Sequence, residues 1–309
     1  MTGKPLIVVT GPTAVGKTKL AIAMCRVLDG EIVSADSRQI YRYMDIGTAK
    51  PDAEEQQAAV HHLIDVVPPD ENLSLAQFQQ MAYDAIEDVH QRGKLPILAG
   101  GTGQYVSAVV EGWSIPEVPP NHALRTELET FASENGAEAL HQRLAALDVA
   151  AAQKIHPNNV RRVVRALEVC METGTPITEL QRKKPPPYHI LQYALHMGRD
   201  ALYERADRRV DMMMDAGLLA EVRWLLENGY PSSLPAMSGI GYRQLAAHLT
   251  GEVMLEQAIE DTKMMTHDFI RRQYTWLRGH GTGLIWQDGP TMDVHGIIEQ
   301  TATWLKDNP

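Results

Sequence analysis

Short apolar runs alternate with longer amphipathic segments in the first hundred residues of the chain. Four of these runs predict strands: residues 6–10, which are rich in β-branched side chains, and residues 31–36, 61–67 and 95–101. Residues 17–28 repeat apolar side chains every three to four positions, which predicts a helix. A second helix is predicted from Ser74, which forms a capping-box pattern with Gln77. Strands that alternate with helices indicate a parallel α/β sheet.

The pattern changes after Trp113. A proline-rich joint at 114–121 and another at 182–189 enclose residues 121–174, which show only helical periodicity. Beyond the second joint the pattern predicts a strand, two long helices and a last strand, at residues 190–195, 201–228, 253–278 and 283–288. We therefore predict an α/β fold, a P-loop NTPase-like parallel sheet flanked by helices with a small all-helical insert. The predicted catalytic core is 1–114 with 189–309, and the predicted insert is 115–188.

Composition limits the class of protein. The chain is 44% hydrophobic and 22% charged, as expected for a globular protein with a substantial core. No apolar stretch approaches the roughly 20 residues of a membrane helix, nothing at the N-terminus resembles a signal peptide, and two cysteines are too few for a disulfide framework. A cytoplasmic location without membrane contact is expected. Because the net charge is −10, nucleic-acid binding would have to come from local basic faces.

The most specific motif is "GPTAVGKT", which follows the first predicted strand. It matches the phosphate-binding loop G-x-x-x-x-G-K-T, whose backbone N–H groups and lysine hold phosphate oxygens and whose hydroxyl suits Mg²⁺. Nucleotide-binding and ATP-binding proteins, kinases and other diphosphate-handling enzymes all use such a loop. The candidate diphosphate-binding residues are Gly11, Pro12, Thr13, Ala14, Val15, Gly16, Lys17 and Thr18.

A second candidate group lies where the neighbouring strands end. Asp36 is expected to face the same crevice as the loop, because carboxyl ends of parallel strands meet at one edge. Its carboxylate could accept a proton or hold Mg²⁺ through water, but it suits a turn or helix cap equally well. The strand at 95–101 ends in "AGGT", without the Asp that holds Mg²⁺ in many ATPases.

Arginines cluster at helical spacing in three places. Each cluster alone is typical of a solvated face, but three in an acidic protein favour a polyanionic partner. The clusters are Arg161, Arg162 and Arg165, then Arg205 and Arg209, then Arg271, Arg272 and Arg278. Tyr274 and Trp276 interleave the last cluster, where they could hold bases or belong to the core.

Several motifs occur together and in order along nearly the whole chain: "GPTAVGKT", "DSRQIYRYMDIGTAKP", "LAGGTGQY", "RALEV", "GIGYRQ" and "RRQYTWLR". In this combination the chain resembles the bacterial tRNA dimethylallyltransferases. The resemblance implies transfer of a dimethylallyl group from dimethylallyl diphosphate to the N6 amine of the adenosine 3′-adjacent to the anticodon in tRNA. The loop would then hold a diphosphate leaving group, with Mg²⁺ as cofactor near Thr18, in an enzyme expected to be monomeric.

The resemblance also assigns roles to residues of this chain. Asp36 corresponds to the general base, Thr102 to the threonine beside the reacting nucleotide, and Arg209 to the arginine that clamps the diphosphate. The helical insert would grip the anticodon stem-loop. The implied tRNA contacts are Asp36, Ser37, Arg38, Gln39, Thr102, Arg125, Val160, Arg161, Arg162, Val163, Val164, Arg165, Gly239, Gly241, Tyr242, Arg243, Arg271, Arg272 and Arg278.

Two other functions remain open at this point. A P-loop small-molecule kinase could use the insert as a lid and would transfer phosphate. A nucleotide-switched binding protein would bind nucleotide without acting on tRNA, although the chain lacks a guanine-reading N-K-x-D motif.

Overall fold

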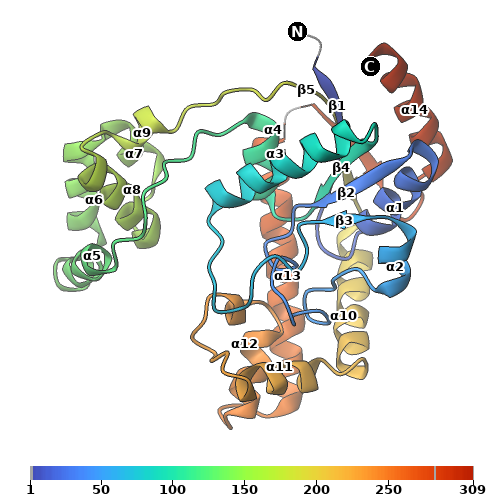
Figure 1. Ribbon diagram of the computed structural model, residues 1–309. Helices are drawn as coiled ribbons and strands as arrows, with labels where there is room; N and C mark the ends of the chain where they lie inside the picture. Colours follow the sequence, from blue (N-terminus) through green and yellow to red (C-terminus); the bar gives the residue numbers. More distant parts are fainter. Residues whose placement is uncertain (1–2, 282, 309) are drawn as a thin grey trace. The chain divides into compact units, whose positions relative to one another are not determined.

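The computed structural model describes residues 3–281 and 283–308 (Figure 1). The chain forms two compact units, which we call the core unit, residues 1–110 with 186–309, and the insert unit, residues 111–185. The sequence pattern places the two joints at 114/115 and 188/189, whereas the compact units meet at 110/111 and 185/186.

Six strands of the described chain form one parallel sheet in the order β3-β2-β4-β1-β5-β6. They are β1 Lys4–Thr10, β2 Gly30–Ser34, β3 His61–His62, β4 Leu95–Gly100, β5 Tyr188–His196 and β6 Leu284–Asp288. The predicted fold class is confirmed. The strand predicted over 61–67 is much shorter, because Leu63 and Asp65 adopt positive φ angles of 62° and 54°, which interrupt extended backbone.

Helices cover both faces of this sheet. The core-unit helices are α1 Lys17–Leu28, α2 Ala53–Ala58, α3 Leu75–Gln91, α4 Gly103–Glu111, α10 Arg199–Asp215, α11 Leu218–Glu227, α12 Tyr242–Leu249, α13 Leu255–His280 and α14 Val294–Asp307. Alternate residues of β1 face opposite ways, so Ile7 packs in a cluster with α1 and α14 whereas Leu6 packs in a cluster with α3 and α4. Burial on both faces explains the unbroken apolar run of β1.

The helix predicted over 201–228 is in fact two helices. α10 ends at Asp215 and α11 begins at Leu218, with Gly217 in the left-handed conformation at φ 100°. Apolar periodicity continues across this break, which is why the pattern predicts one helix. The capping box at Ser74 and Gln77 is present as predicted. The pattern does not indicate α2, which has no buried residue and therefore no apolar stripe.

The insert unit is all-helical. Its helices are α5 His122–Asn135, α6 Ala137–Leu147, α7 Val149–Lys154, α8 Val160–Thr173 and α9 Ile177–Leu180. They enclose a separate core that includes Leu128, Leu140, Leu144 and Leu167. Across the described residues of both units, every helix is too short or too polar to cross a bilayer.

Candidate active site

The glycine loop connects β1 to α1 and depends on both of its glycines. Gly11 and Gly16 have φ angles of 151° and 108°, which L side chains rarely adopt. A Cβ at Gly11 would also lie 2.8 Å from the carbonyl oxygen of Leu195 on β5. The loop can therefore turn sharply onto the N-terminus of α1, where backbone N–H groups attract anions.

Lys17 is the first residue of α1, and its ammonium lies inside the loop. Its Nζ donates to the carbonyl oxygen of Pro12 at 2.7 Å. Burial lowers the pKa of Lys17 to about 8, Asp36 opposes this shift, and Arg209 adds to it. Lys17 is therefore within electrostatic reach of both Asp36 and Arg209.

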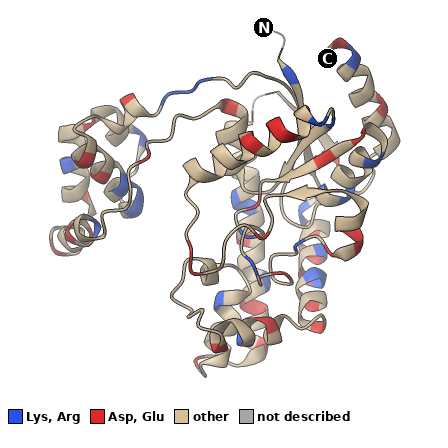
Figure 2. Cartoon of the chain, viewed as in Figure 1, with Lys and Arg blue, Asp and Glu red and all other residues tan. Residues whose placement is uncertain are grey.

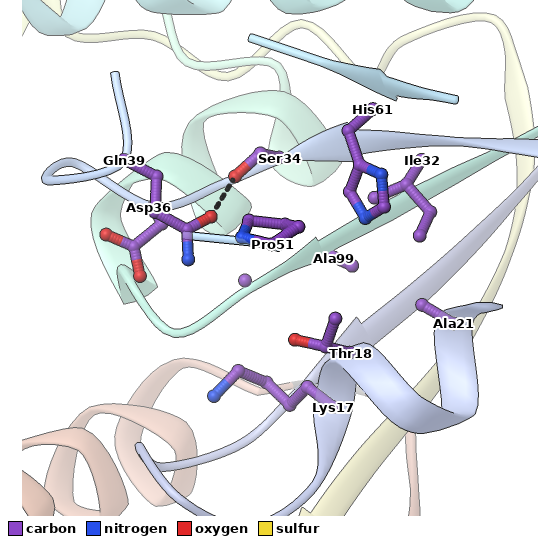
Figure 3. Close-up of a pocket in the computed structure, with 11 residues that line it drawn as sticks. Lys17, Thr18, Ala21, Ile32, Ser34, Asp36, Gln39, Pro51, His61 and Ala99 are labelled. Carbon is purple, nitrogen blue, oxygen red and sulfur yellow. Dashed lines mark hydrogen bonds between the residues drawn. The ribbon is translucent and has the colours of Figure 1, made fainter. Parts of the chain in front are cut away.

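A pocket opens beside the loop, at the carboxyl ends of β2 and β4 (Figure 3). It holds about 380 Å³ of space, part of which is open to solvent. Its lining residues are Lys17, Thr18, Ala21, Ile32, Ser34, Asp36, Gln39, Pro51, His61, Ala99 and Gly100. The structure thus brings the loop lysine and hydroxyl together with the carboxylate of Asp36, although they are far apart in sequence.

Asp36 follows β2 in a turn. Its Oδ1 accepts a hydrogen bond from the backbone N–H of Arg38 at 2.9 Å, so it is a turn aspartate as well as a residue of the pocket. Thr102 holds the next residue, because its Oγ1 accepts from the N–H of Ser37 at 3.0 Å. Gly100 allows the two strand ends to approach, since a Cβ there would lie 2.1 Å from the carbonyl oxygen of Ala35. Thr102 and Gly100 therefore position the segment that carries Asp36.

Arg209 on α10 is half-buried and forms no hydrogen bond or ion pair with any residue that the structure describes. Burial lowers the pKa of its guanidinium, while Asp36 and Glu55 oppose the shift. An arginine remains charged at neutral pH even so. Its charge is thus held close to Lys17 and Asp36 with its hydrogen-bond donors uncommitted.

The other residues of "DSRQ" bind neighbouring backbone. Arg38 donates to the carbonyl oxygens of Pro235 and Ala236 at 2.9 and 3.2 Å, and the Nε2 of Gln39 donates to that of Ala49 at 3.0 Å. Both side chains, predicted as tRNA contacts, therefore have structural roles in this conformation.

The predicted contacts in "GIGYRQ" divide into buried and exposed residues. Gly239, Gly241 and Tyr242 are buried, and the Tyr242 hydroxyl donates to Glu221 at 2.6 Å. The Tyr242 ring fills the space beside Gly47, so its side chain is not available to tRNA in this conformation, and the contact at this residue stays a prediction. Arg243 is exposed.

On α13, Arg271, Arg272 and Arg278 are exposed as a partner surface would require, although Arg271 is ion-paired with Asp268. Tyr274 and Trp276 are half-buried and hold structural contacts. The Tyr274 hydroxyl donates to the carbonyl oxygen of Met197 at 3.2 Å, and the Trp276 indole donates to the Ser107 hydroxyl at 3.2 Å.

The arginines of the insert unit have two different environments. Arg125 donates to both carboxylate oxygens of buried Glu168 at 2.7 and 2.8 Å, and Arg165 donates to the same carboxylate. Arg161 and Arg162 are exposed, and Val160 is half-buried. The side chains of Val163 and Val164 lie in the insert core at 0% and 3% exposure, so they are not available to tRNA in this conformation, and the contacts at these residues stay predictions.

Two residues at this edge of the core unit escaped prediction. Glu221 accepts from the N–H groups of Asp45 and Ile46 at 3.0 and 2.8 Å and so anchors the "DIGTAKP" segment. Gln273 accepts from the N–H of Thr13 in the glycine loop at 2.9 Å. A polar residue on the buried stripe of α13, between Ile270 and Leu277, was the signal that could have identified Gln273.

Comparison with known proteins identifies the family. The family model described as IPP transferase matches residues 39–280. The chain is 55% identical over 274 residues to a tRNA dimethylallyltransferase of Roseiflexus castenholzii, covering 89% of this chain and 90% of that relative. It is 45% identical over 303 residues to a tRNA dimethylallyltransferase of Dehalococcoides mccartyi, covering 98% of this chain and 93% of the relative.

Solved structures agree. A tRNA isopentenylpyrophosphate transferase from Bacillus halodurans has a TM-score of 0.74 and 40% identity, covering 99% of this chain and 98% of its own. A eukaryotic dimethylallyltransferase acting on tRNA has a TM-score of 0.82 and 26% identity, covering 99% of this chain and 80% of its own. Together with the glycine loop and its pocket, these similarities show that the chain belongs to the tRNA dimethylallyltransferase family.

Proposed function

We propose that this protein transfers a dimethylallyl group from dimethylallyl diphosphate to the N6 amine of the adenosine 3′-adjacent to the anticodon of tRNA, releasing diphosphate. Family membership supports prenyl transfer to tRNA. The observation that carries the residue-level assignment is that Asp36 shares one pocket with Lys17 and Thr18.

The glycine loop would bind the leaving group. When the allylic C–O bond breaks, its electron pair leaves with the diphosphate, which gains negative charge while the carbon becomes electron-poor. Lys17 and Arg209 are cations held close to that position, and electrostatic stabilisation of developing charge is often the largest catalytic contribution. Loop N–H groups add donors to the same oxygens.

Asp36 would serve the acceptor. The adenine amine is a weak nucleophile, because its lone pair is delocalised into the ring, and it becomes cationic as the new C–N bond forms. A carboxylate in hydrogen-bond reach can take the proton during this step. The base must first leave its stack. Thr102, half-buried beside the segment that carries Asp36, is the residue of this turn that we assign to the unstacked base.

The donor atoms of the pocket fit Mg²⁺. Thr18 and Asp36 present oxygen atoms, which are the ligands this hard cation prefers. Thr18 would hold the ion against the diphosphate, with Asp36 nearby. When bound, Mg²⁺ would neutralise part of the diphosphate charge.

Exposed arginines of each unit would contact tRNA. Arg161 and Arg162 on α8, Arg243 on α12 and Arg272 on α13 are free to meet phosphates, and the partner we propose is the anticodon stem-loop. We further propose that the enzyme acts as a monomer, because one chain carries the loop, the base and the arginines. We also propose that it acts in the cytoplasm. Sedimentation of the free protein would test the monomer.

The decisive experiment is incubation with unmodified tRNA and dimethylallyl diphosphate, followed by mass spectrometry of the digested nucleosides. We expect one adenosine to gain a five-carbon unit, with stoichiometric release of diphosphate. A parallel reaction with ATP tests the kinase alternative. Added phosphate, or binding of ATP without any new nucleoside, would contradict prenyl transfer.

A further inference from the structure

Gln273 is a buried amide on α13 that contacts two loops at once. Its Oε1 accepts from the N–H of Thr13 in the glycine loop, and its Nε2 donates to the carbonyl oxygen of Gly101, both at 2.9 Å. The side-chain orientation follows from the partners, because an N–H must meet the amide oxygen and a carbonyl must meet the amide nitrogen. The residue is only 7% exposed.

The two loops that Gln273 joins follow neighbouring strands. Thr10 of β1 pairs with Gly100 of β4, and the glycine loop and the Gly101 turn continue directly from these residues. Under the proposed function the first loop binds the donor diphosphate and the second receives the acceptor base.

The packing around Gly101 leaves room for this bridge. A Cβ at Gly101 would lie 2.6 Å from Nε2 of Gln273 and 3.3 Å from Nζ of Lys17. A larger residue would displace the bridging amide and crowd the catalytic lysine. The absence of a side chain at Gly101 is therefore explained by the bridge.

We propose that Gln273 is a positioning residue, which fixes the glycine loop and the Gly101 turn in the spacing that prenyl transfer requires. This inference rests on the proposed function. Gln273 touches neither reacting group by this argument; it acts through the two backbone segments. A misplacement of about 1 Å between reacting groups can lower the rate by about 10²-fold.

The Gln273 bridge also determines which backbone N–H groups of the glycine loop can bind the diphosphate of the substrate. While Gln273 holds the N–H of Thr13, that donor is not available to the diphosphate. The predicted diphosphate contact at Thr13 would then have to come from another atom of the residue.

The test compares Gln273→Met, which keeps the length and volume but removes both hydrogen bonds, with Tyr274→Phe. Tyr274 is the next residue on α13, and its hydroxyl bonds with the backbone of Met197 at the end of β5. Tyr274→Phe therefore weakens the attachment of α13 without touching either loop. We expect Gln273→Met to lower kcat about 10- to 100-fold, with both KM values changed less than about threefold. Tyr274→Phe should keep kcat within about threefold of wild type.

Near-normal kcat in Gln273→Met, or an equal loss in Tyr274→Phe, would show that Gln273 merely supports the helix. If Gln273→Met folds poorly, Gln273→Asn serves instead. It keeps the amide on a stem one methylene shorter, which cannot reach both loops, so the same kcat loss is expected.

Hydrogen–deuterium exchange provides a readout that does not depend on the reaction. In substrate-free protein, peptides covering 11–18 and 99–103 should exchange faster in Gln273→Met than in wild type or Tyr274→Phe. Unchanged exchange would overturn the bridge. Wild-type protein that makes no prenylated nucleoside would instead count against the proposed function and leave the exchange result to decide the bridge.

Discussion

The core unit and the insert unit use their charged residues in different ways, although basic and acidic residues occur on the helices of both units (Figure 2). In the core unit, Lys17 and Asp36 come from separate segments and line one pocket, and Arg209 from a third segment influences Lys17 electrostatically. In the insert unit, Arg165 holds a buried carboxylate while Arg161, on the same helix, is exposed. Convergence of distant segments is therefore the stronger sign of chemistry, and spacing along one helix is the weaker.

Glu168 explains why some arginines of the insert unit are hydrogen-bonded to a buried carboxylate while others are exposed. This residue is fully buried, and burial alone raises the pKa of its carboxyl. Hydrogen bonds from Arg125, Arg165 and the N–H of Asn121 outweigh burial and lower that pKa to about 2. A buried charge without such partners would be strongly destabilising, so two arginines are committed to the fold.

The largest expected effect tests the convergent site. Asp36→Asn keeps the shape and one acceptor oxygen but cannot take a proton, so we expect kcat to fall about 10²–10⁴-fold. The fold and tRNA affinity should change little, and extra Mg²⁺ should not restore the rate. The measurement is steady-state prenyl transfer with circular dichroism as the folding control. Rescue by Mg²⁺ would reassign Asp36 to the metal, and normal turnover would remove it from catalysis.

Arg209→Ala comes next, with Thr18→Ala beside it. Arg209→Ala removes a preorganised charge at the leaving group, and Thr18→Ala removes the hydroxyl proposed to hold Mg²⁺. Each should lower kcat/KM for dimethylallyl diphosphate by about 10²–10³-fold, while tRNA filter binding persists. Arg208→Ala is the matched control, because Arg208 is an exposed neighbour on the same helix. Equal losses in Arg208→Ala and Arg209→Ala would mean that α10 contributes a diffuse charge and not a clamp.

A smaller effect, on stability, is expected for Arg125→Ala. Two hydrogen bonds to a buried carboxylate are lost, so the insert unit should unfold more easily by about 2 kcal/mol, measured by urea denaturation. Arg162→Ala should change stability by less than about 0.5 kcal/mol. If the two variants lose the same unfolding free energy, the buried Glu168 carboxylate does not need the hydrogen bonds from Arg125.

The pH dependence of stability also tests whether Arg125 stabilises the ionised Glu168 carboxylate. The folded-state pKa of Glu168 lies below its ordinary value of 4.5, so its stabilising contribution is complete above about pH 4.5 and is lost as pH falls toward about 2. In Arg125→Ala the pKa of Glu168 should lie closer to its ordinary value. The pH range over which stability is lost should therefore be narrower, as measured by urea denaturation at a series of pH values.

The smallest effect concerns tRNA affinity. Arg161→Ala with Arg162→Ala should weaken tRNA binding and reduce the log–log salt slope by about 0.9 for each lost phosphate contact. Stability should be unchanged, because both side chains are exposed. An unaltered slope would show that these arginines do not contact tRNA.

Local patterns predicted much of this molecule. The strand before the glycine loop, the capping box at Ser74 and the helical insert were all recognisable, because each depends on the order of neighbouring residues. The break at Gly217 was missed, since apolar spacing continues through it. The burial of Val163 and Val164 was not foreseen, because a motif shows that residues occur together and does not show which side chains are buried.

By itself, the sequence determined the fold class, the phosphate-binding loop and the family, since periodicity and motifs are local properties of the chain. Only the tertiary structure decided that Arg165 supports Glu168, that Tyr242 fills space beside Gly47, and that Gln273 joins the loops after β1 and β4. These partners are separated by anything from a few residues to most of the chain. Which polar groups meet depends on packing and burial, and desolvation makes each such pairing obligatory once the surrounding core has formed.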